Sequence, residues 1–231
     1  MPKPRAPQID AWSYSRWRTY DDCPARARYT YVDKLATGDD DSPALARGSR
    51  IHAGARDFVV LGGDLPEDLE RFADEFAILR RAWEGKLEDV LLEEQWAFDR
   101  DWNPVEWFAP SAWARVVLDA LVADWPKRQA LVVDHKTGRV RPEGHESQLS
   151  LYALAVLSRY ADVDRVHATL WYLDHGVAHG RTYLRAQLDD LRKGWLGRVE
   201  PMLSDRTFEP RPSDACRWCP FSKSKEGPCR Y

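Results

Sequence analysis

Apolar residues in the N-terminal third of the chain recur every three or four positions, the spacing typical of amphipathic helices. This pattern predicts helices over residues 13–35, 44–61 and 66–86. Ser13 or Ser15 stands near the start of the first run, where a serine hydroxyl would accept a hydrogen bond from an unpaired backbone N–H group. The N-terminal part of the chain is therefore expected to be helical.

The pattern then changes to short apolar runs bounded by turn or charged residues, as in consecutive β-strands. Strands are predicted over residues 89–99, 106–110, 113–124 and 129–138. These runs are rich in valine, leucine and aromatic side chains. Such residues pack well on the pleated surface of a sheet.

Helical spacing returns over residues 143–160, and a strand over 165–176 and a helix over 186–203 follow. Strands mixed with helices in this way predict an α/β fold with a mixed central sheet flanked by helices. Prolines recur in the segment that follows, which is therefore expected to be irregular.

A chain of 231 residues can bury one sizeable core, so we expect a single domain over residues 1–231. Three parts are expected within it. They are a helical N-terminal part (1–88), an α/β core (89–203) and a C-terminal cysteine module (204–231) that Cys23 completes.

The formal net charge of −3 does not by itself indicate a nucleic-acid binder, but the charge is unevenly distributed. Residues 61–102 carry thirteen acidic and five basic side chains, whereas residues 206–231 carry six basic and three acidic ones. The sequence shows neither a signal peptide nor an apolar stretch long enough to cross a membrane. We therefore expect a cytoplasmic protein without membrane association, whose cysteines stay reduced.

Two carboxylates and a lysine lie near the ends of two predicted strands. Asp119 falls within one strand, and Asp134 and Lys136 end the next. Side chains two positions apart on a strand point to the same face, so Asp134 and Lys136 are expected to lie together. Converging carboxylates suit Mg²⁺ or Mn²⁺, and a lysine can orient water or stabilise charge on a phosphate. A surface salt bridge is the alternative for an isolated D-x-K sequence.

The segments LDALVAD, VVDHKTG and QLSLYALAV resemble the active-site core of the RecB-like branch of the PD-(D/E)XK nucleases. The resemblance implies a restriction-endonuclease-like core in which Asp119, Asp134 and Lys136 are catalytic and the two aspartates bind the metal. It also implies a Q-x-x-x-Y motif at Gln148 and Tyr152. These two residues share one helix face and would flank the site.

The same resemblance implies a metal-binding histidine within a G-x-x-x-H segment, which Gly48 and His52 match. Glu94 is a further candidate metal ligand from an earlier strand, with Glu93 expected to face the other way. His135, inside the D-x-K motif, is expected to point away from the catalytic pair.

Three of the four cysteines lie in the C-terminal sequence CRWCPFSKSKEGPCRY. Cys216 and Cys219 form a C-x-x-C pair, Cys229 follows, and Cys23 lies near the other end of the chain. Four thiolates of this kind fit a zinc site or an iron–sulfur cluster. The residues alone leave both alternatives open.

A subset of RecB-like nucleases carries one cysteine in an N-terminal helix and three at the C-terminus, and these four bind a [4Fe–4S] cluster. It includes AddB-type recombination nucleases and CRISPR-associated adaptation nucleases. Ser15, Tyr20, Cys23 and Pro24 match the S-x-x-x-x-Y-x-x-C-P form of the N-terminal element, and CRWCPF…GPC resembles the C-terminal one. The resemblance therefore implies a [4Fe–4S] cluster with a structural role.

Together these features predict an Mg²⁺- or Mn²⁺-dependent deoxyribonuclease of a bacterial cell or a phage-infected host. We expect an exonuclease that acts on DNA ends or single strands, because no helix-turn-helix or zinc-finger array is evident. DNA is the expected partner, and a recombination or CRISPR-adaptation protein is a possible second one. The alternative from another class is a non-catalytic, zinc- or cluster-stapled module that binds nucleic acid.

Overall fold

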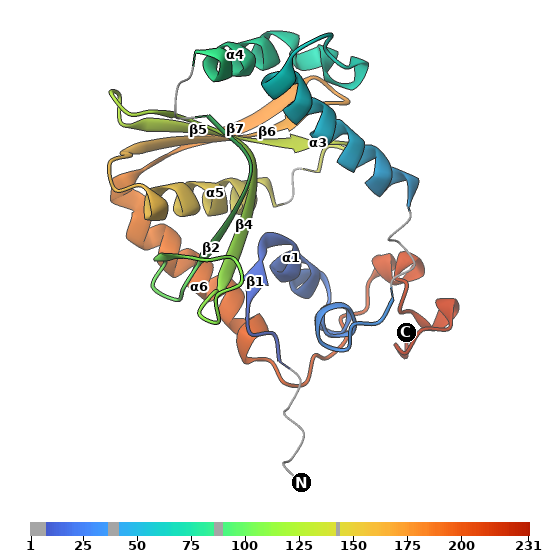
Figure 1. The fold of residues 1–231 in the computed structure, drawn as a ribbon. Helices are drawn as coiled ribbons and strands as arrows, with labels where there is room; N and C mark the ends of the chain where they lie inside the picture. The colour runs from blue at the N-terminus through green and yellow to red at the C-terminus, as the bar shows by residue number, and fades with distance from the viewer. Residues whose placement is uncertain (1–7, 37–41, 86–89, 142–143) are drawn as a thin grey trace.

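The computed structural model describes residues 8–36, 42–85, 90–141 and 144–231 (Figure 1). The predicted boundary between the helical part and the core, at residues 88–89, lies outside these ranges. No helix in the described ranges combines the length and apolar character that crossing a bilayer requires.

The strands form one seven-stranded sheet in the order β3-β2-β4-β5-β6-β7, with β1 added beside β4. Only β5–β6 and β1–β4 are parallel pairs. The strands are Trp12–Ser13 (β1), Val90–Phe98 (β2), Pro104–Val105 (β3), Ala114–Asp124 (β4), Gln129–Lys136 (β5), Arg165–Tyr172 (β6) and Val177–Leu184 (β7). The predicted mixed α/β fold is confirmed, with a sheet that is mostly antiparallel.

Helices lie on both faces of this sheet, with α5 and α6 on one side and α3 and α4 on the other (Figure 1). The α-helices are Tyr14–Asp22 (α1), Pro24–Ala27 (α2), Pro43–Leu61 (α3), Ala73–Glu84 (α4), His145–Arg159 (α5) and Leu188–Ser204 (α6). Each face has its own apolar core. The larger contains Leu118, Leu154 and Trp195, and the smaller contains Phe76 and Val133.

Local sequence explains where several helices begin. The Ser13 hydroxyl accepts a hydrogen bond from Arg16 N, as predicted for the cap of α1. Ser42 caps α3 in the same way, and Pro43 occupies its first turn, where a missing N–H group costs nothing. Residues 148–157 of α5 are all buried, because this helix lies between the sheet and α6.

Three sequence predictions are wrong in detail. The helix predicted over 13–35 breaks at Cys23, which is extended because the residue before a proline avoids helical geometry. The strand predicted over 106–110 is not formed, and the residues just before it, Pro104–Val105, pair with β2 instead. The strand predicted over 165–176 ends at Tyr172, and a turn containing Gly176 at φ +62° leads into β7.

The N-terminal segment packs into the larger core rather than beside it. Trp12 stacks on Trp195 of α6 with ring centroids 5.2 Å apart, and Trp17 meets the same ring edge-on. Both N-terminal tryptophans are buried. This packing holds β1 and α1 against α6 and the start of β4, next to the site described below.

Candidate active site and cysteine site

The two predicted catalytic aspartates lie where β4 and β5 separate. The two strands are paired from Asp124↔Gln129 to Ala120↔Val133, and beyond that point the pairing stops. The Asp119 carboxylate takes its place, since Oδ2 accepts a hydrogen bond from His135 N at 2.6 Å. Asp119 and Asp134 are only 8% and 6% exposed, so both residues are almost fully buried near the point where the strands separate.

Asp134 is surrounded by the other predicted residues of the motif. Its Oδ1 accepts hydrogen bonds from Tyr152 OH and from Gln148 Nε2, the latter at 3.3 Å. Its Oδ2 lies 2.6 Å from Lys136 Nζ, yet this buried oxygen receives no well-directed hydrogen bond. Burial raises the pKa of Asp134, and the Lys136 charge opposes that shift. A buried carboxylate oxygen with spare acceptor capacity is what a cation would use.

His52 approaches the same point from α3. Its Nδ1 lies 3.3 Å from Asp119 Oδ1. Burial pushes the pKa of Asp119 upward, but the hydrogen bond from His52 and the nearby histidine charges outweigh it, and the net pKa is lowered. The same hydrogen bond raises the pKa of His52. Asp119 therefore stays ionised and available as a ligand.

His135 lies between Asp134 and Lys136 in the sequence and is expected to point away from them. Its Nδ1 lies 3.8 Å from Asp119 Oδ2, and its ring packs against Phe76 and Trp171. Within the described ranges, His52, Asp119 and His135 form the group whose donor atoms lie within 4.8 Å of one another. The sequence pattern gave no indication of this approach to Asp119, which comes from the neighbouring strand.

Burial lowers the pKa of His135 to about 4, which predicts an acid-sensitive fold. The folded state keeps the ring neutral, whereas the unfolded chain takes up a proton near pH 6.5. With EDTA present, the free energy of unfolding should therefore fall by up to about 3 kcal/mol as pH drops from 6.5 towards 4. Urea denaturation across this range measures it. His135→Leu should flatten the dependence, while His167→Leu, at an exposed histidine, should retain it. Identical pH profiles for wild type and His135→Leu would contradict this assignment.

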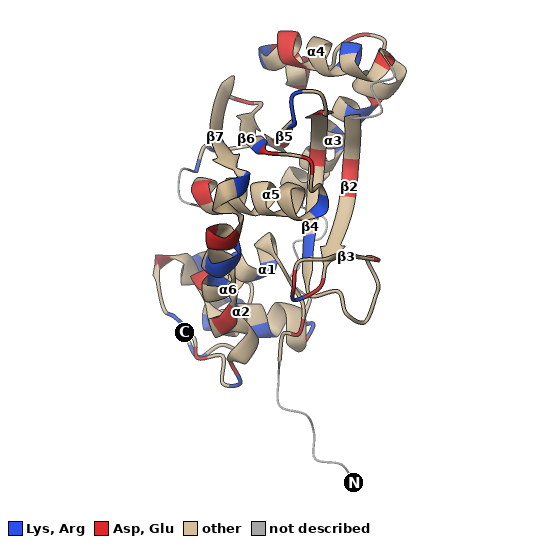
Figure 2. Ribbon diagram, turned by 90° about the vertical axis from the view of Figure 1, so that its left-hand side faces the viewer, with Lys and Arg blue, Asp and Glu red and all other residues tan. Residues whose placement is uncertain are grey.

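Glu93 and Glu94 lie in the acidic stretch of β2 (Figure 2). Glu94 accepts a hydrogen bond from Trp96 Nε1 at 3.0 Å. Glu93 falls between the paired residues Leu92↔Ala120 and Glu94↔Leu118, has φ +54° and lines a cavity with His52. Burial and the Asp119 charge raise the pKa of Glu93. The expected orientation of Glu93 is thus wrong, because the β2–β4 register that decides it cannot be read from the sequence.

A comparison with protein-family models gives a match over most of the chain. The family model described as the PD-(D/E)XK nuclease superfamily matches residues 11–224. The chain belongs to the PD-(D/E)XK nuclease superfamily. A search of the curated proteins found no match. Among solved structures, this nuclease is similar to the crystal structure of SSO0001, with 15% identity and a TM-score of 0.45. That alignment covers 99% of this chain and 90% of the other.

The donor atoms of the nuclease site fit a hard divalent cation. One Asp119 carboxylate oxygen and a ring nitrogen of each of His52 and His135 converge, and membership of this superfamily suggests metal-dependent nuclease activity. A cavity of about 380 Å³ opens onto Asp119 and Asp134. A second cavity of about 500 Å³ is lined by Lys136 and three arginines (Arg18, Arg139 and Arg141), and Gln148 and Tyr14 line both cavities.

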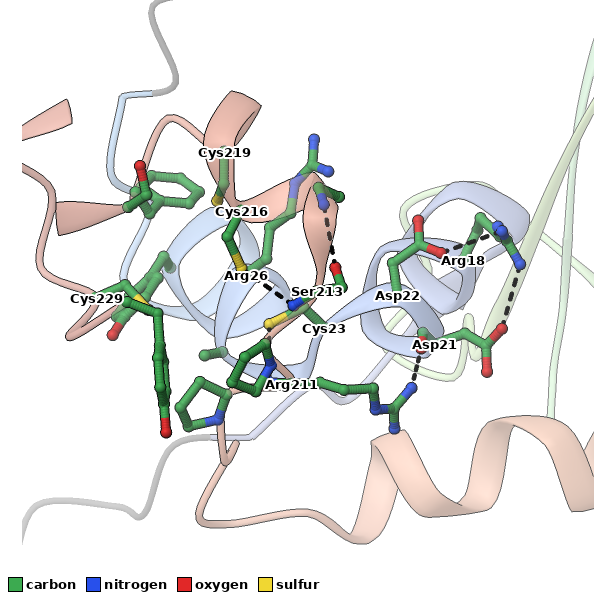
Figure 3. A pocket seen from close by; sticks show the side chains of 18 of the residues that line it. Arg18, Asp21, Asp22, Cys23, Arg26, Arg211, Ser213, Cys216, Cys219 and Cys229 are labelled. Atoms are coloured by element: carbon green, nitrogen blue, oxygen red, sulfur yellow. Dashed lines mark hydrogen bonds and ion pairs between the residues drawn. The ribbon is translucent and has the colours of Figure 1, made fainter. Parts of the chain in front are cut away.

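The four cysteines of the nuclease line a single cavity of about 560 Å³ (Figure 3). All four are free thiols, although Cys23 comes from the break between α1 and α2 and the others come from the C-terminal segment. Cys23 Sγ accepts a hydrogen bond from Arg211 N, and Cys216 Sγ accepts one from Ser213 N, both at 3.4 Å. Burial raises the pKa of Cys219.

Proposed function

We propose that the chain is a metal-dependent deoxyribonuclease of the RecB-like branch. Its substrates would be DNA ends or single strands, which it degrades as an exonuclease. The observation that carries the proposal is the convergence of Asp119, Asp134 and Lys136 at the parting of β4 and β5. The family match over residues 11–224 supports the nuclease chemistry. A recombination or CRISPR-adaptation protein remains the proposed partner.

Each residue of the site has a proposed role. His52, Asp119 and Asp134 would hold Mg²⁺ or Mn²⁺, with Glu93 better placed than Glu94 to contribute an oxygen. When bound, the metal polarises the scissile phosphate and makes water more acidic. Lys136 would orient that water and stabilise charge that develops on the phosphate.

Gln148 and Tyr152 act on Asp134 as well as lining the substrate cavity. Both donate hydrogen bonds to Asp134 Oδ1, and Gln148 also donates to Tyr152 OH at 2.8 Å. These two bonds leave the other carboxylate oxygen facing Lys136. The motif on α5 therefore fixes the rotamer of a proposed metal ligand.

We further propose that the four cysteines bind a [4Fe–4S] cluster that joins the two ends of the single domain. All four cysteines line one cavity, which supports a shared ligand. The resemblance of the cysteine pattern to that of cluster-bearing RecB-like nucleases favours a cluster over a single zinc ion. The two N–H···S bonds also fit cluster thiolates.

Loss of the lysine charge tests the proposed chemistry. Lys136→Met should lower the initial rate of single-stranded DNA cleavage in saturating Mg²⁺ by about 10²–10³-fold, the usual effect of removing one preorganised transition-state contact. Lys127→Met is the matched control, because Lys127 pairs with Asp124 at the far end of the same two strands. A rate unchanged in Lys136→Met would remove this residue from the proposed mechanism.

A further inference from the structure

Two arginines face the cavity that opens onto the proposed catalytic carboxylates. Arg16 comes from the first turn of α1 and Arg115 from the start of β4, where the neighbouring residue on β1 is Ser13. Trp107 lines the same cavity, with the Arg115 guanidinium 5.4 Å from its ring centroid. The basic groups and the carboxylates therefore belong to one continuous space.

Both guanidiniums are held in place by neutral partners. Arg16 donates a hydrogen bond to Ala11 O at 2.9 Å and lies over the ring of Tyr31. Arg115 Nε donates to Trp107 O at 3.1 Å. Among the residues that the structure describes, no carboxylate forms an ion pair with either arginine. Within the described residues, both guanidiniums are thus oriented by neutral groups and not by an ion pair.

Their proximity is unfavourable in the free protein. Burial lowers the pKa of Arg16, and the positive charge of Arg115 lowers it further. Like charges in a partly buried site repel each other unless an anion lies between them. The N-terminal turn of α1, which lines the same cavity, adds the positive end of a helix dipole.

We propose that Arg16 and Arg115 jointly bind one internal phosphate of an unpaired DNA strand, next to the phosphate that is cleaved. This inference rests on the proposed nuclease function and names its substrate more closely. Arginine is suited to the role because its planar fork matches phosphate oxygens. The Trp107 ring keeps the Arg115 fork oriented.

The shape of the cavity favours an unpaired strand over a duplex. Asp119 and Asp134 line a cavity of about 380 Å³ and are almost fully buried. The backbone of a duplex cannot enter such a space without its partner strand, whereas a single strand can turn its phosphates inward. The arginine pair would then anchor the strand as it reaches the carboxylates.

Salt dependence of binding tests the proposal without requiring cleavage. The full, cluster-loaded protein is titrated in EDTA against a fluorescent single-stranded oligonucleotide at 50–200 mM salt, followed by anisotropy. Removing one phosphate contact should lower the slope of log K against log salt by about 0.7. The affinity ratio of wild type to Arg115→Gln should then shrink about 3-fold over this range. Arg16→Gln and the double variant should give the same slope change, because both arginines serve one phosphate.

Two further variants distinguish the loss of a positive charge from a change in the folded structure. Arg115→Lys keeps the charge and should retain the wild-type slope. Arg198→Gln is the matched control, because Arg198 lies 5.4 Å from the Trp195 ring on α6 and lines none of the cavities at the active site. Its slope should also equal that of wild type.

The possible outcomes are distinguishable. An unchanged slope in Arg16→Gln and Arg115→Gln, while wild type still binds and cleaves single strands in Mg²⁺, would overturn the phosphate site alone. A slope change seen only with 5′-phosphorylated oligonucleotides would overturn the internal phosphate in favour of a terminal one. A wild-type protein that neither binds nor cleaves single strands would overturn the proposed function and this inference together.

Discussion

Asp134→Asn is expected to lower the rate of DNA cleavage at least about a thousand-fold while the protein stays folded. The amide keeps the shape of the carboxylate, and its oxygen can still accept the hydrogen bonds from Tyr152 and Gln148. It loses the charge that would bind the cation. The measurement is the initial rate of single-stranded DNA degradation in Mg²⁺, with thermal unfolding recorded on the same preparations.

The sign of the stability effect follows from the pKa of Asp134. Because burial raises that pKa, the ionised side chain destabilises the fold as pH rises above the usual aspartate range. A neutral asparagine removes this penalty, although Lys136 loses its partner. We therefore expect a melting temperature within a few degrees of wild type.

Asp124→Asn is the matched control for this prediction. Asp124 ends the neighbouring strand β4 and pairs with Lys127 at the turn into β5, away from the gap between the strands. Its cleavage rate should stay within about 2-fold of wild type, because exposed ion pairs contribute little. Equal activity of Asp134→Asn and wild type would contradict the proposed site.

Cys23→Ser is expected to release the proposed cluster and to destabilise the whole chain. Cys23 lies near the start of the sequence, whereas Cys216, Cys219 and Cys229 lie near its end, and all four line one cavity. A cluster bound by all four would therefore close almost the full chain into a loop. A cross-link over so long a loop restricts the unfolded chain by about 5 kcal/mol. Iron content, the visible spectrum and urea denaturation of anaerobically purified protein measure both effects.

Ala215→Ser provides the control for the cysteine substitution. It introduces the same hydroxyl beside Cys216, at another residue that lines the cavity, and should leave iron and stability unchanged. A colourless wild-type protein that contains one zinc ion would contradict the cluster. Equal iron content in wild type and Cys23→Ser would remove Cys23 from the ligand set.

Much of the active site could be predicted because its residues follow local rules. Spacing along β5 places Asp134 beside Lys136, and spacing along α5 places Gln148 beside Tyr152. The contact of His52 with Asp119 is long-range, and the family resemblance supplied that expectation. The roles of these residues remain proposals, but their proximity is now a structural fact.

The remaining features depend on register and packing. Glu93 shares a cavity with His52 because α3 lies against this part of β2, and Arg16 and Arg115 line one cavity because β1 pairs with β4. β7 is largely exposed and polar, so its sequence lacks the apolar alternation that reveals a strand. Such positions become visible only when distant segments are brought together.

The most direct test of the central proposal is a time course on two DNA substrates of the same sequence, one linear and end-labelled, the other a closed single-stranded circle. For a metal-dependent exonuclease, we expect the linear strand to be shortened from an end in Mg²⁺ or Mn²⁺ and the circle to persist. EDTA should stop the reaction. Degradation that continues in EDTA, or a linear strand that stays intact with either metal, would contradict the proposal.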